Sequence, residues 1–154
     1  MSADDNRNLV RRYDDEVLNR RKYDALPELV ADDYVDHGAP PGSPTGPGAA
    51  RYGIEAMVAG IPDLTVQSED IVAEGDTVAF RSTITGTHTG VLFGMPPSNK
   101  PVTLTSVQMW RIVDGKLAER WIGIDIMPLL ASASSWGASE PAAGAAGGQD
   151  WSPR

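Results

Sequence analysis

The spacing of apolar residues changes from a helical to a strand period near the middle of the chain. Residues 8–19 and 49–60 carry apolar side chains at the spacing of amphipathic helices, and residues 23–30 predict a shorter helix between them. Residues 64–72 and 77–85 instead alternate apolar and polar positions, which predicts two strands joined by a short turn. The chain therefore places its helices first and its strands afterwards.

Two connections and one short helix complete this pattern. Residues 38–48, GAPPGSPTGPG, are too rich in proline and glycine for a helix or a central strand, and residues 86–101 form a second long connection. A last helical turn is expected at residues 126–131. Helices followed by antiparallel strands indicate an α+β fold, in which the helices pack on one face of a curved sheet and enclose a pocket against it.

The register of the last hairpin, residues 102–125, follows from its turn. Asp114 and Gly115 are a two-residue signal for a type I′ turn, because both tolerate positive φ angles. Pairing then runs outward from Val113 opposite Lys116, with alternate side chains on each face. The face expected to line the pocket carries Leu104, Ser106, Gln108, Trp110, Ile112, Leu117, Glu119, Trp121, Gly123 and Asp125.

This face combines large aromatic side chains with polar ones, an arrangement typical of the wall of a ligand cavity. Apolar surface would bury a ligand, and the few polar groups would orient it. A solvated face with scattered tryptophans is the alternative. Tyr13, on the apolar side of the first helix, is expected either to pack in the core or to donate a hydrogen bond into the pocket mouth.

Chain length and the composition of its end favour a single domain. A chain of 154 residues is long enough to bury about two thirds of its unfolded surface. Residues 132–154 are mainly Ala, Gly, Ser and Pro, which bury too little apolar area to offset the cost of ordering them, so this tail is expected to be disordered. Its Trp136 and Trp151 leave a lid or a dimer arm open as alternatives. The folded domain is assigned to residues 1–131.

Charge and residue types exclude several classes of protein. The chain has no cysteine and two histidines, His37 and His88, so no metal site is expected. No glycine-rich phosphate-binding motif follows a strand, and no cofactor is expected. A net charge of -8 argues against a nucleic-acid partner, which requires clustered Lys and Arg. Without a signal-peptide pattern or an apolar run of membrane-spanning length, we expect a cytoplasmic protein with no membrane partner.

Six short motifs occur in a fixed order along the chain. They are Asp33-Tyr34-Val35-Asp36-His37, Pro62-Asp63-Leu64, Glu74-Gly75-Asp76-Thr77-Val78-Ala79, Gly86-Thr87-His88-Thr89-Gly90, Gly94-Met95-Pro96-Pro97 and Arg111-Ile112-Val113-Asp114-Gly115-Lys116. In this order they resemble the SnoaL-like polyketide cyclases, a branch of the NTF2-like cone fold. The resemblance covers residues 9–130 and implies N-terminal helices packed on a curved antiparallel sheet around a pocket.

The resemblance also implies a catalytic carboxylate in the last strand. In the family's aromatic polyketide cyclases this residue acts as general acid and base for an intramolecular aldol ring closure, and it corresponds here to Asp125. The predicted register independently places Asp125 on the cavity face. A strand-end cap is the alternative role for Asp125, in which case Asp36 or Glu119 would be the next candidates.

The remaining site residues follow from the same resemblance and from the hairpin. His37 is expected to be a second proton carrier or to orient Asp125, with capping of the chain beside Asp36 as the alternative. A histidine that these cyclases share on the preceding strand corresponds to Gln108, which forms hydrogen bonds but cannot exchange a proton near neutral pH. The residues expected to bind substrate are Gln108, Trp110, Trp121, Ser106 and Tyr13.

These expectations indicate a cofactor-free cyclase of antibiotic or related secondary metabolism. It would act on a small hydrophobic, polyketide-like substrate and form a homo-oligomer, a dimer or a tetramer. One alternative is a cofactor-independent hydroxylase, or a hydrolase or isomerase of the same fold. Epoxide hydrolases of this fold use an Arg-x-Asp strand motif, and none of the predicted strands contains one. The other alternative is a dimeric module that binds a small molecule without catalysis.

Overall fold

The computed structural model describes residues 1–132 of the chain. Its first helix begins earlier than the apolar spacing predicts, because Ser2 and Asp5 form a reciprocal capping box before Ala3. The elements are α1 (Ala3–Arg12), the π-helical η1 (Tyr13–Asn19), the 3₁₀ turn η2 (Tyr23–Ala25), α2 (Leu26–Leu29), β1 (Val30–Asp36), α3 (Pro47–Gly60), β2 (Thr65–Glu74), β3 (Thr77–Thr87), β4 (Pro101–Val113), β5 (Lys116–Asp125) and α4 (Met127–Ser132).

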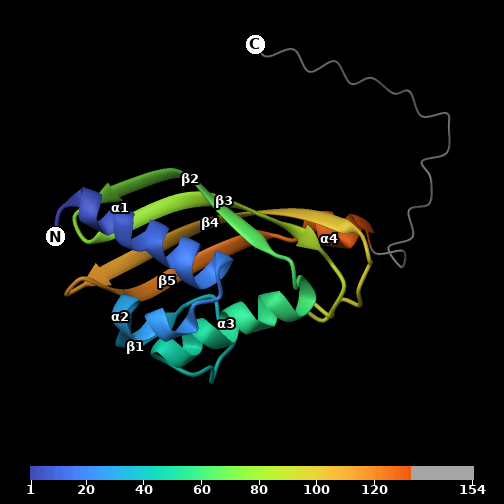
Figure 1. Ribbon diagram of the computed structural model, residues 1–154, viewed down its shortest axis with the longest axis horizontal. Helices are drawn as coiled ribbons and strands as arrows, with labels where there is room; N and C mark the ends of the chain where they lie inside the picture. The colour runs from blue at the N-terminus through green and yellow to red at the C-terminus, as the bar shows by residue number, and fades with distance from the viewer. Residues whose placement is uncertain (133–154) are drawn as a thin grey trace, which may run out of the picture.

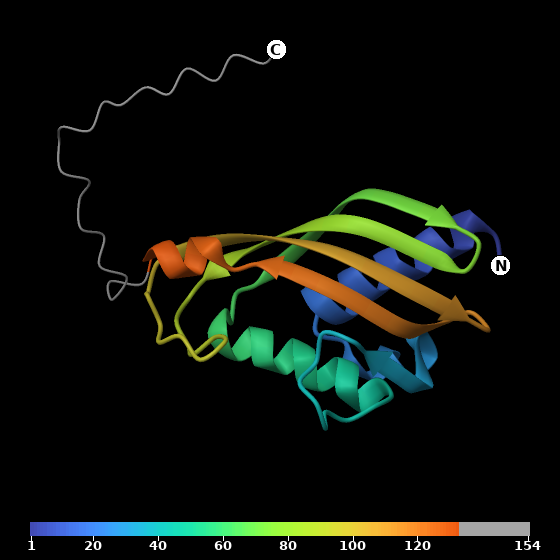
Figure 2. The same ribbon diagram turned by 180° about the vertical axis from the view of Figure 1, so that it is seen from behind.

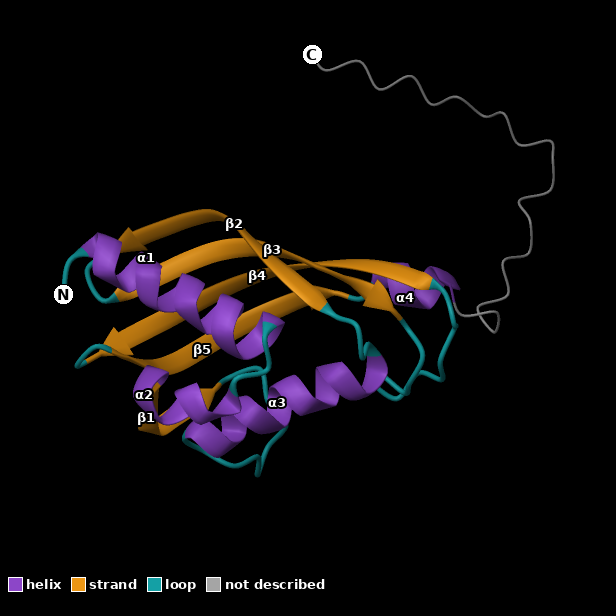
Figure 3. Ribbon diagram, viewed as in Figure 1, coloured by secondary structure: helices purple, strands orange, loops and turns teal. Residues whose placement is uncertain are grey.

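The five strands form one curved sheet in the order β1-β5-β4-β3-β2 (Figure 1, Figure 3). Neighbouring strands are antiparallel except for β1, which runs parallel to β5. Helices α1 and α3 pack on the same face of the sheet, and Figure 2 shows, from the opposite side, α1 behind the strands and α3 below them. The predicted α+β fold, with helices on one face of a curved sheet, is confirmed.

Strand β1 was missing from the predicted elements. Residues 23–30 were expected to be helical through Val30, but the helix ends at Leu29 and Val30 begins the strand. Only Val30 and Tyr34 are buried in this edge strand, so its sequence shows no clear alternation of apolar and polar positions. Its final residue, Asp36, pairs with Arg120 of β5 and brings a carboxylate beside the inner face of that strand.

The core consists of two clusters of buried side chains. The first surrounds Trp110 of β4, which is fully buried between Tyr13 of η1 and Tyr34 of β1. The second lies around Leu104 at the other end of β4 and includes Leu129 of α4. Strand β4 contributes buried residues to both clusters. Its alternating buried side chains therefore define which face of the sheet packs against the helices.

The predicted hairpin turn is confirmed, but the predicted register is wrong beyond it. Asp114 and Gly115 have φ angles of 48° and 75°, as a type I′ turn requires. Val113 pairs with Lys116 and Ile112 with Leu117, and then Arg111 pairs with Glu119. Ala118 is therefore an extra residue in β5, a β-bulge.

The bulge exchanges the two faces of β5 from Glu119 onward. A strand alternates its side chains with a period of two, so one extra residue reverses every later side chain. Trp110 pairs with Arg120 rather than with Glu119, and Gln108 with Ile122 rather than with Trp121. Arg120, Ile122 and Ile124 thus occupy the inner face that the prediction gave to Glu119, Trp121 and Asp125.

None of the helices within residues 1–132 is long and apolar enough to cross a membrane. Helix α4 extends to Ser132, one residue into the expected tail. The predicted disorder of that tail, and the alternative roles of Trp136 and Trp151, concern residues beyond those that the structure describes.

Candidate functional site

A cavity of about 370 Å³ lies between α3, the loop that follows β1, and the inner face of the sheet. Most of its wall is apolar, and every strand of the sheet contributes to it, β1 through its last residue, Asp36. The charged and amide groups that line it are Asp36, Gln108 and Arg120. Apolar side chains on the wall include Leu64, Val66, Ile84, Leu92, Ile122 and Ile124.

Asp36 and Arg120 form an ion pair at one end of this cavity. They are direct neighbours on β1 and β5, and Arg120 Nη2 donates to Asp36 Oδ2. The other carboxylate oxygen, Asp36 Oδ1, accepts a hydrogen bond of 2.9 Å from the backbone N–H of Gly38. A Cβ atom at Gly38 would lie 2.8 Å from Ile122, so the close approach of this loop requires glycine. The side chains of Asp36 and Arg120 are 9% and 15% exposed.

Aromatic groups surround the guanidinium of Arg120 on its buried side. Its central carbon lies 5.4 Å from the centre of the Trp110 ring, a cation–π distance. Burial opposes the charge of Arg120, yet Tyr34, Tyr13 and Asp36 raise its pKa above the ordinary value, so it stays a cation. Burial in turn raises the pKa of Tyr13 to about 12, and that of Tyr34 also rises. Both tyrosines are therefore neutral hydroxyl groups at physiological pH.

Gln108 presents an amide at the floor of the cavity. Its Nε2 donates to Ser106 Oγ at 3.2 Å and to Ser82 Oγ at 3.4 Å, and the two serine hydroxyls are 2.6 Å apart. All three residues are buried. The serines fix the orientation of the amide, because a buried polar group without a hydrogen bond would cost about 1–3 kcal/mol.

A further carboxyl group lies behind this wall. Asp14 of η1 is 5% exposed and accepts a hydrogen bond from Ser68 of β2. Burial raises its pKa to about 6, while the hydrogen bond from Ser68 and the charge of Arg120 act in the opposite direction. Asp14 was not among the predicted site residues, since it lies within a run of acidic residues typical of a solvated helix face.

The predicted site residues are divided between the two faces of the sheet. Gln108 lines the cavity, as predicted, and Ser106 lies beneath it. Trp110 and Tyr13 are on the inner face but are packed in the core, where the centres of their rings lie 5.1 Å apart. For Tyr13 this agrees with the core alternative. Trp110 faces inward as expected, but Arg120, which lies over its ring, lines the cavity and Trp110 does not.

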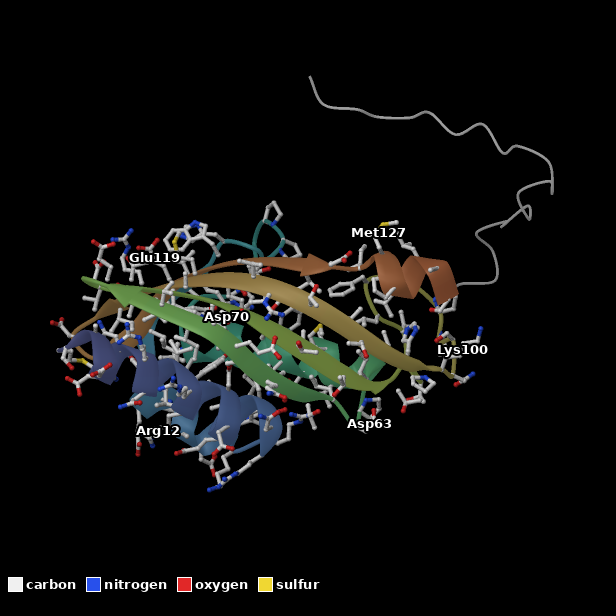
Figure 4. All side chains as sticks on the ribbon, turned by 90° about the horizontal axis from the view of Figure 1, so that it is seen from above. Arg12, Asp63, Asp70, Lys100, Glu119 and Met127 are labelled. Atoms are coloured by element: carbon white, nitrogen blue, oxygen red, sulfur yellow. The ribbon has the colours of Figure 1, made fainter. Side chains whose placement is uncertain are left out.

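His37, Glu119 and Trp121 form a separate cluster on the outer face of the sheet. His37 Nε2 is 2.8 Å from Glu119 Oε2, and its ring stacks on Trp121 at 4.5 Å. Arg111 forms ion pairs with Glu119 and Asp76, both at 3.2 Å. Figure 4 looks onto this face, with Glu119 labelled and α3 behind the sheet. The expectation that Trp121 lines the cavity is wrong, because the bulge at Ala118 directs it outward.

Asp125 is also absent from the cavity wall. It is exposed at the end of β5, and its Oδ1 accepts a hydrogen bond of 3.0 Å from the backbone N–H of Met127 at the start of α4. This is the strand-end cap considered as the alternative role. The predicted cavity-facing position of Asp125 is therefore wrong, and Asp36, one of the two reserve candidates, is the carboxylate that lines the cavity.

Arg120 lines the cavity but was not among the predicted site residues. A signal for it was present, because the apolar residues of β5 change parity between Leu117 and the pair Ile122 and Ile124. Strand residues on one face share parity, so this change requires one inserted residue between them. Within residues 1–132 no group of three or more His, Asp or Glu side chains has an arrangement that could hold a metal ion.

The geometry described above can be compared with known proteins. The family model for SnoaL-like polyketide cyclases matches residues 8–132. The chain therefore belongs to the SnoaL-like polyketide cyclase family. No curated protein matches the sequence.

Solved structures give the same fold. IdmH from Streptomyces antibioticus, described as a candidate polyketide cyclase, is 32% identical with a TM-score of 0.71, covering 82% of this chain and 96% of its own. AclR from Streptomyces galilaeus, described as a candidate hydroxylase, is 28% identical with a TM-score of 0.70, and the match covers 84% of this chain and 96% of AclR. TsrD from Streptomyces laurentii superimposes with a TM-score of 0.78, and the match covers 87% of this chain and 98% of TsrD. Its sequence identity of 22% supports the fold alone.

Proposed function

We propose that this protein is a cyclase that closes a carbon ring in a small polyketide-like substrate by acid–base catalysis without a cofactor. The proposal depends mainly on one observation, the buried Asp36–Arg120 ion pair at the end of an apolar cavity. Membership of the SnoaL-like family supports it, since that family comprises polyketide cyclases and related enzymes. The similarity to IdmH, at 32% identity, supports the same class of reaction.

The distribution of polar groups in the cavity favours a substrate with one oxygen-rich end. Asp36, Arg120 and Gln108 would contact carbonyl or enol oxygens, because they offer both donors and acceptors. The wall around Ile84 and Leu92 offers only apolar contacts, which suit a hydrocarbon part of the same molecule. A linear chain that carries alternating ketones at one end has this chemistry.

The proposed roles follow from these positions. Asp36 removes a proton from the methylene group between two carbonyls, and Arg120 stabilises the enolate oxygen that forms. The enolate carbon then attacks a second carbonyl of the same chain, and the new carbon–carbon bond closes the ring. Asp36 returns its proton to the resulting alkoxide, so the carboxylate is restored at the end of the cycle.

The fold would contribute as much by positioning as by proton transfer. Holding the chain in a reactive conformation can supply several kcal/mol, up to roughly 7–11 in the best cases. One positioned acid or base typically contributes about 10²–10⁴-fold in rate. Gln108, which its serine neighbours hold in place, is proposed to orient a substrate oxygen rather than to transfer a proton.

A hydroxylase is the second candidate, and one observation favours it. AclR, described as a candidate hydroxylase, shares the fold at 28% identity and covers most of this chain. Both reactions begin with an enolate or a related anion next to a cationic donor, so the same cavity suits either. Product analysis separates them, because a cyclase product has the elemental composition of its substrate or loses water, whereas a hydroxylase product gains one oxygen atom.

The test is ring closure of a linear poly-β-ketone thioester, followed by mass spectrometry and compared with the uncatalysed rate. Asp36→Asn should lower the catalysed rate by roughly 10²-fold or more while substrate binding changes little. Asp33→Asn, an exposed carboxylate on the same strand, is the matched control and should keep full activity. Full activity of Asp36→Asn would contradict the proposed role. Binding without turnover by the wild-type protein would favour the non-catalytic module.

A further inference from the structure

The buried part of the site contains two carboxyl groups and one guanidinium. Asp36 and Arg120 neutralise each other in their ion pair. Asp14 also feels the charge of Arg120, but its hydrogen bond comes from the neutral hydroxyl of Ser68. Its other oxygen, Oδ1, is buried without a hydrogen-bond partner among residues 1–132. A carboxylate in such a position is costly, since burying an unpaired charge is strongly unfavourable.

Asp14 lies directly behind the cavity wall. Leu18, one helical turn further along η1, lines the cavity, and so does Val66, which precedes Ser68 by two residues on the same face of β2. Ser68 is paired with Ser82, the serine that contacts Gln108. Asp14 and its partner Ser68 therefore lie on elements, η1 and β2, whose neighbouring residues form part of the cavity wall.

In the described part of the chain, none of the groups around Asp14 forms an ion pair with it, so it can gain or lose a proton independently of the Asp36–Arg120 pair. Ser68 faces it from β2 and Arg120 from β5, and Tyr13 is its neighbour on η1. Asp36 of β1 is already paired with Arg120. Ser68 does not titrate, Tyr13 and Arg120 keep their protons at physiological pH, and burial places the pKa of Asp14 at about 6.

We propose that Asp14 is a second carboxyl group of this site and that its charge controls how strongly the cavity binds a negatively charged oxygen. The ligand chemistry is that of an enolate or carboxylate oxygen attached to an apolar body. The inference rests on the proposed function in so far as the enolate of a polyketide-like substrate is such a ligand. Asp14 acts through Arg120 and not by contact, so it is a positioning residue.

The reason is the charge balance of the buried groups. With a proton on Asp14, the net charge of Asp14, Asp36 and Arg120 is zero, and Arg120 can stabilise an incoming oxyanion. Without that proton the net charge is -1, and the oxyanion meets an additional buried negative charge, which low local dielectric makes expensive. By thermodynamic linkage, a bound anion must in turn favour the proton on Asp14.

Two ligands of the same shape test this inference, namely the naphthoate anion and its neutral amide, naphthamide. Binding is measured by titration calorimetry between about pH 5 and about pH 7.5, a range that spans the titration of Asp14. Wild-type protein should bind naphthoate at least about tenfold more weakly at the higher pH, a change of roughly 1.4 kcal/mol. Naphthamide should bind with the same affinity at the lower and the higher pH. The Asp14→Asn variant should bind naphthoate with little dependence on pH.

A carbon-13 NMR titration of the Asp14 carboxyl, assigned by its loss in Asp14→Asn, gives a readout that needs no ligand. Asp14 should titrate near pH 6 in the free protein and at higher pH with naphthoate bound. The inference is overturned if Asp14 titrates at the ordinary value of about 3.9. It also fails if Asp14→Asn keeps the pH dependence of naphthoate binding, or if naphthoate does not bind at either pH.

These results are separable from the proposed function. If Asp36→Asn keeps full turnover while naphthoate binding follows the charge of Asp14, the cyclase mechanism fails and the anion inference stands. If Asp36→Asn abolishes turnover while naphthoate binding does not depend on the charge of Asp14, the cyclase mechanism stands and the anion inference fails. Asp15→Asn, at the exposed neighbouring position, is the control variant for both measurements.

Discussion

Replacement of Asp14 by Asn should change the pH dependence of stability in a direction that the structure determines. The pKa of Asp14 rises from 3.8 to about 6 on folding, chiefly because of burial. A raised pKa means that the folded state holds a proton that the unfolded state has already lost. Stability from this proton is fully present below pH 3.8 and is lost as the pH rises through about 6.

The magnitude follows from the size of the shift. About two pKa units correspond to roughly 3 kcal/mol, since each unit is worth 1.36 kcal/mol. The wild-type protein should therefore lose about 3 kcal/mol relative to Asp14→Asn between about pH 4 and about pH 7.5. Any constant effect of the substitution, such as an altered hydrogen bond with Ser68, cancels in this comparison between pH values.

Urea unfolding at a series of pH values measures the effect. The free energies of unfolding of the two proteins should diverge from about pH 4 to about pH 6 and then run parallel. Asp15→Asn, which changes an exposed carboxylate one residue away, should give a curve parallel to that of the wild type. Parallel curves for wild type and Asp14→Asn over the whole range would refute the reasoning that Asp14 is buried without a charge partner of its own.

Two further predictions concern the inner face of the sheet. Deletion of Ala118 should remove the bulge but leave Glu119 opposite Arg111 and Arg120 opposite Trp110, because side chains then alternate without interruption after Leu117. The deletion variant should therefore fold, with a loss of stability of no more than about 0.5–3 kcal/mol, and Ala118→Gly, which keeps the chain length, should cost about 1 kcal/mol. A deletion variant that fails to fold would show that Ala118 is not a dispensable extra residue of β5. Gln108→Met keeps the length of the side chain but removes its hydrogen bonds, so KM for a poly-β-ketone substrate should rise about tenfold while kcat changes little. An equal loss in kcat would indicate that Gln108 acts in the transition state instead.

The sequence predicted the layout of the fold because its strongest signals are local. The period of apolar residues identified the longer helices and strands, and Asp114-Gly115 identified the turn. Strand β1 was missed because an edge strand with few buried residues has no clear apolar period. The order of helices and strands, together with the mixed aromatic and polar face of the hairpin, also indicated a pocket between the helices and the sheet.

The site was predicted only on the strand where the register held. Gln108 and Ser106 of β4 face inward as expected, because no irregularity lies between them and the turn on their own strand. On β5 a single extra residue reversed the assignment of every side chain after Ala118. The carboxylate of the cavity came from β1, whose parallel pairing with β5 depends on contacts distant in sequence.

The proposed catalytic site lies on the inner face of the sheet at Asp36 and Arg120, and not at Asp125 at the end of β5. The most direct test measures ring closure of the same linear poly-β-ketone thioester by Asp36→Asn and Asp125→Asn, each compared with the wild type. Asp36→Asn should lose roughly 10²-fold or more in kcat, and Asp125→Asn, whose carboxylate caps the turn before Met127, should stay within about twofold. A large loss in Asp125→Asn together with full activity in Asp36→Asn would contradict the account.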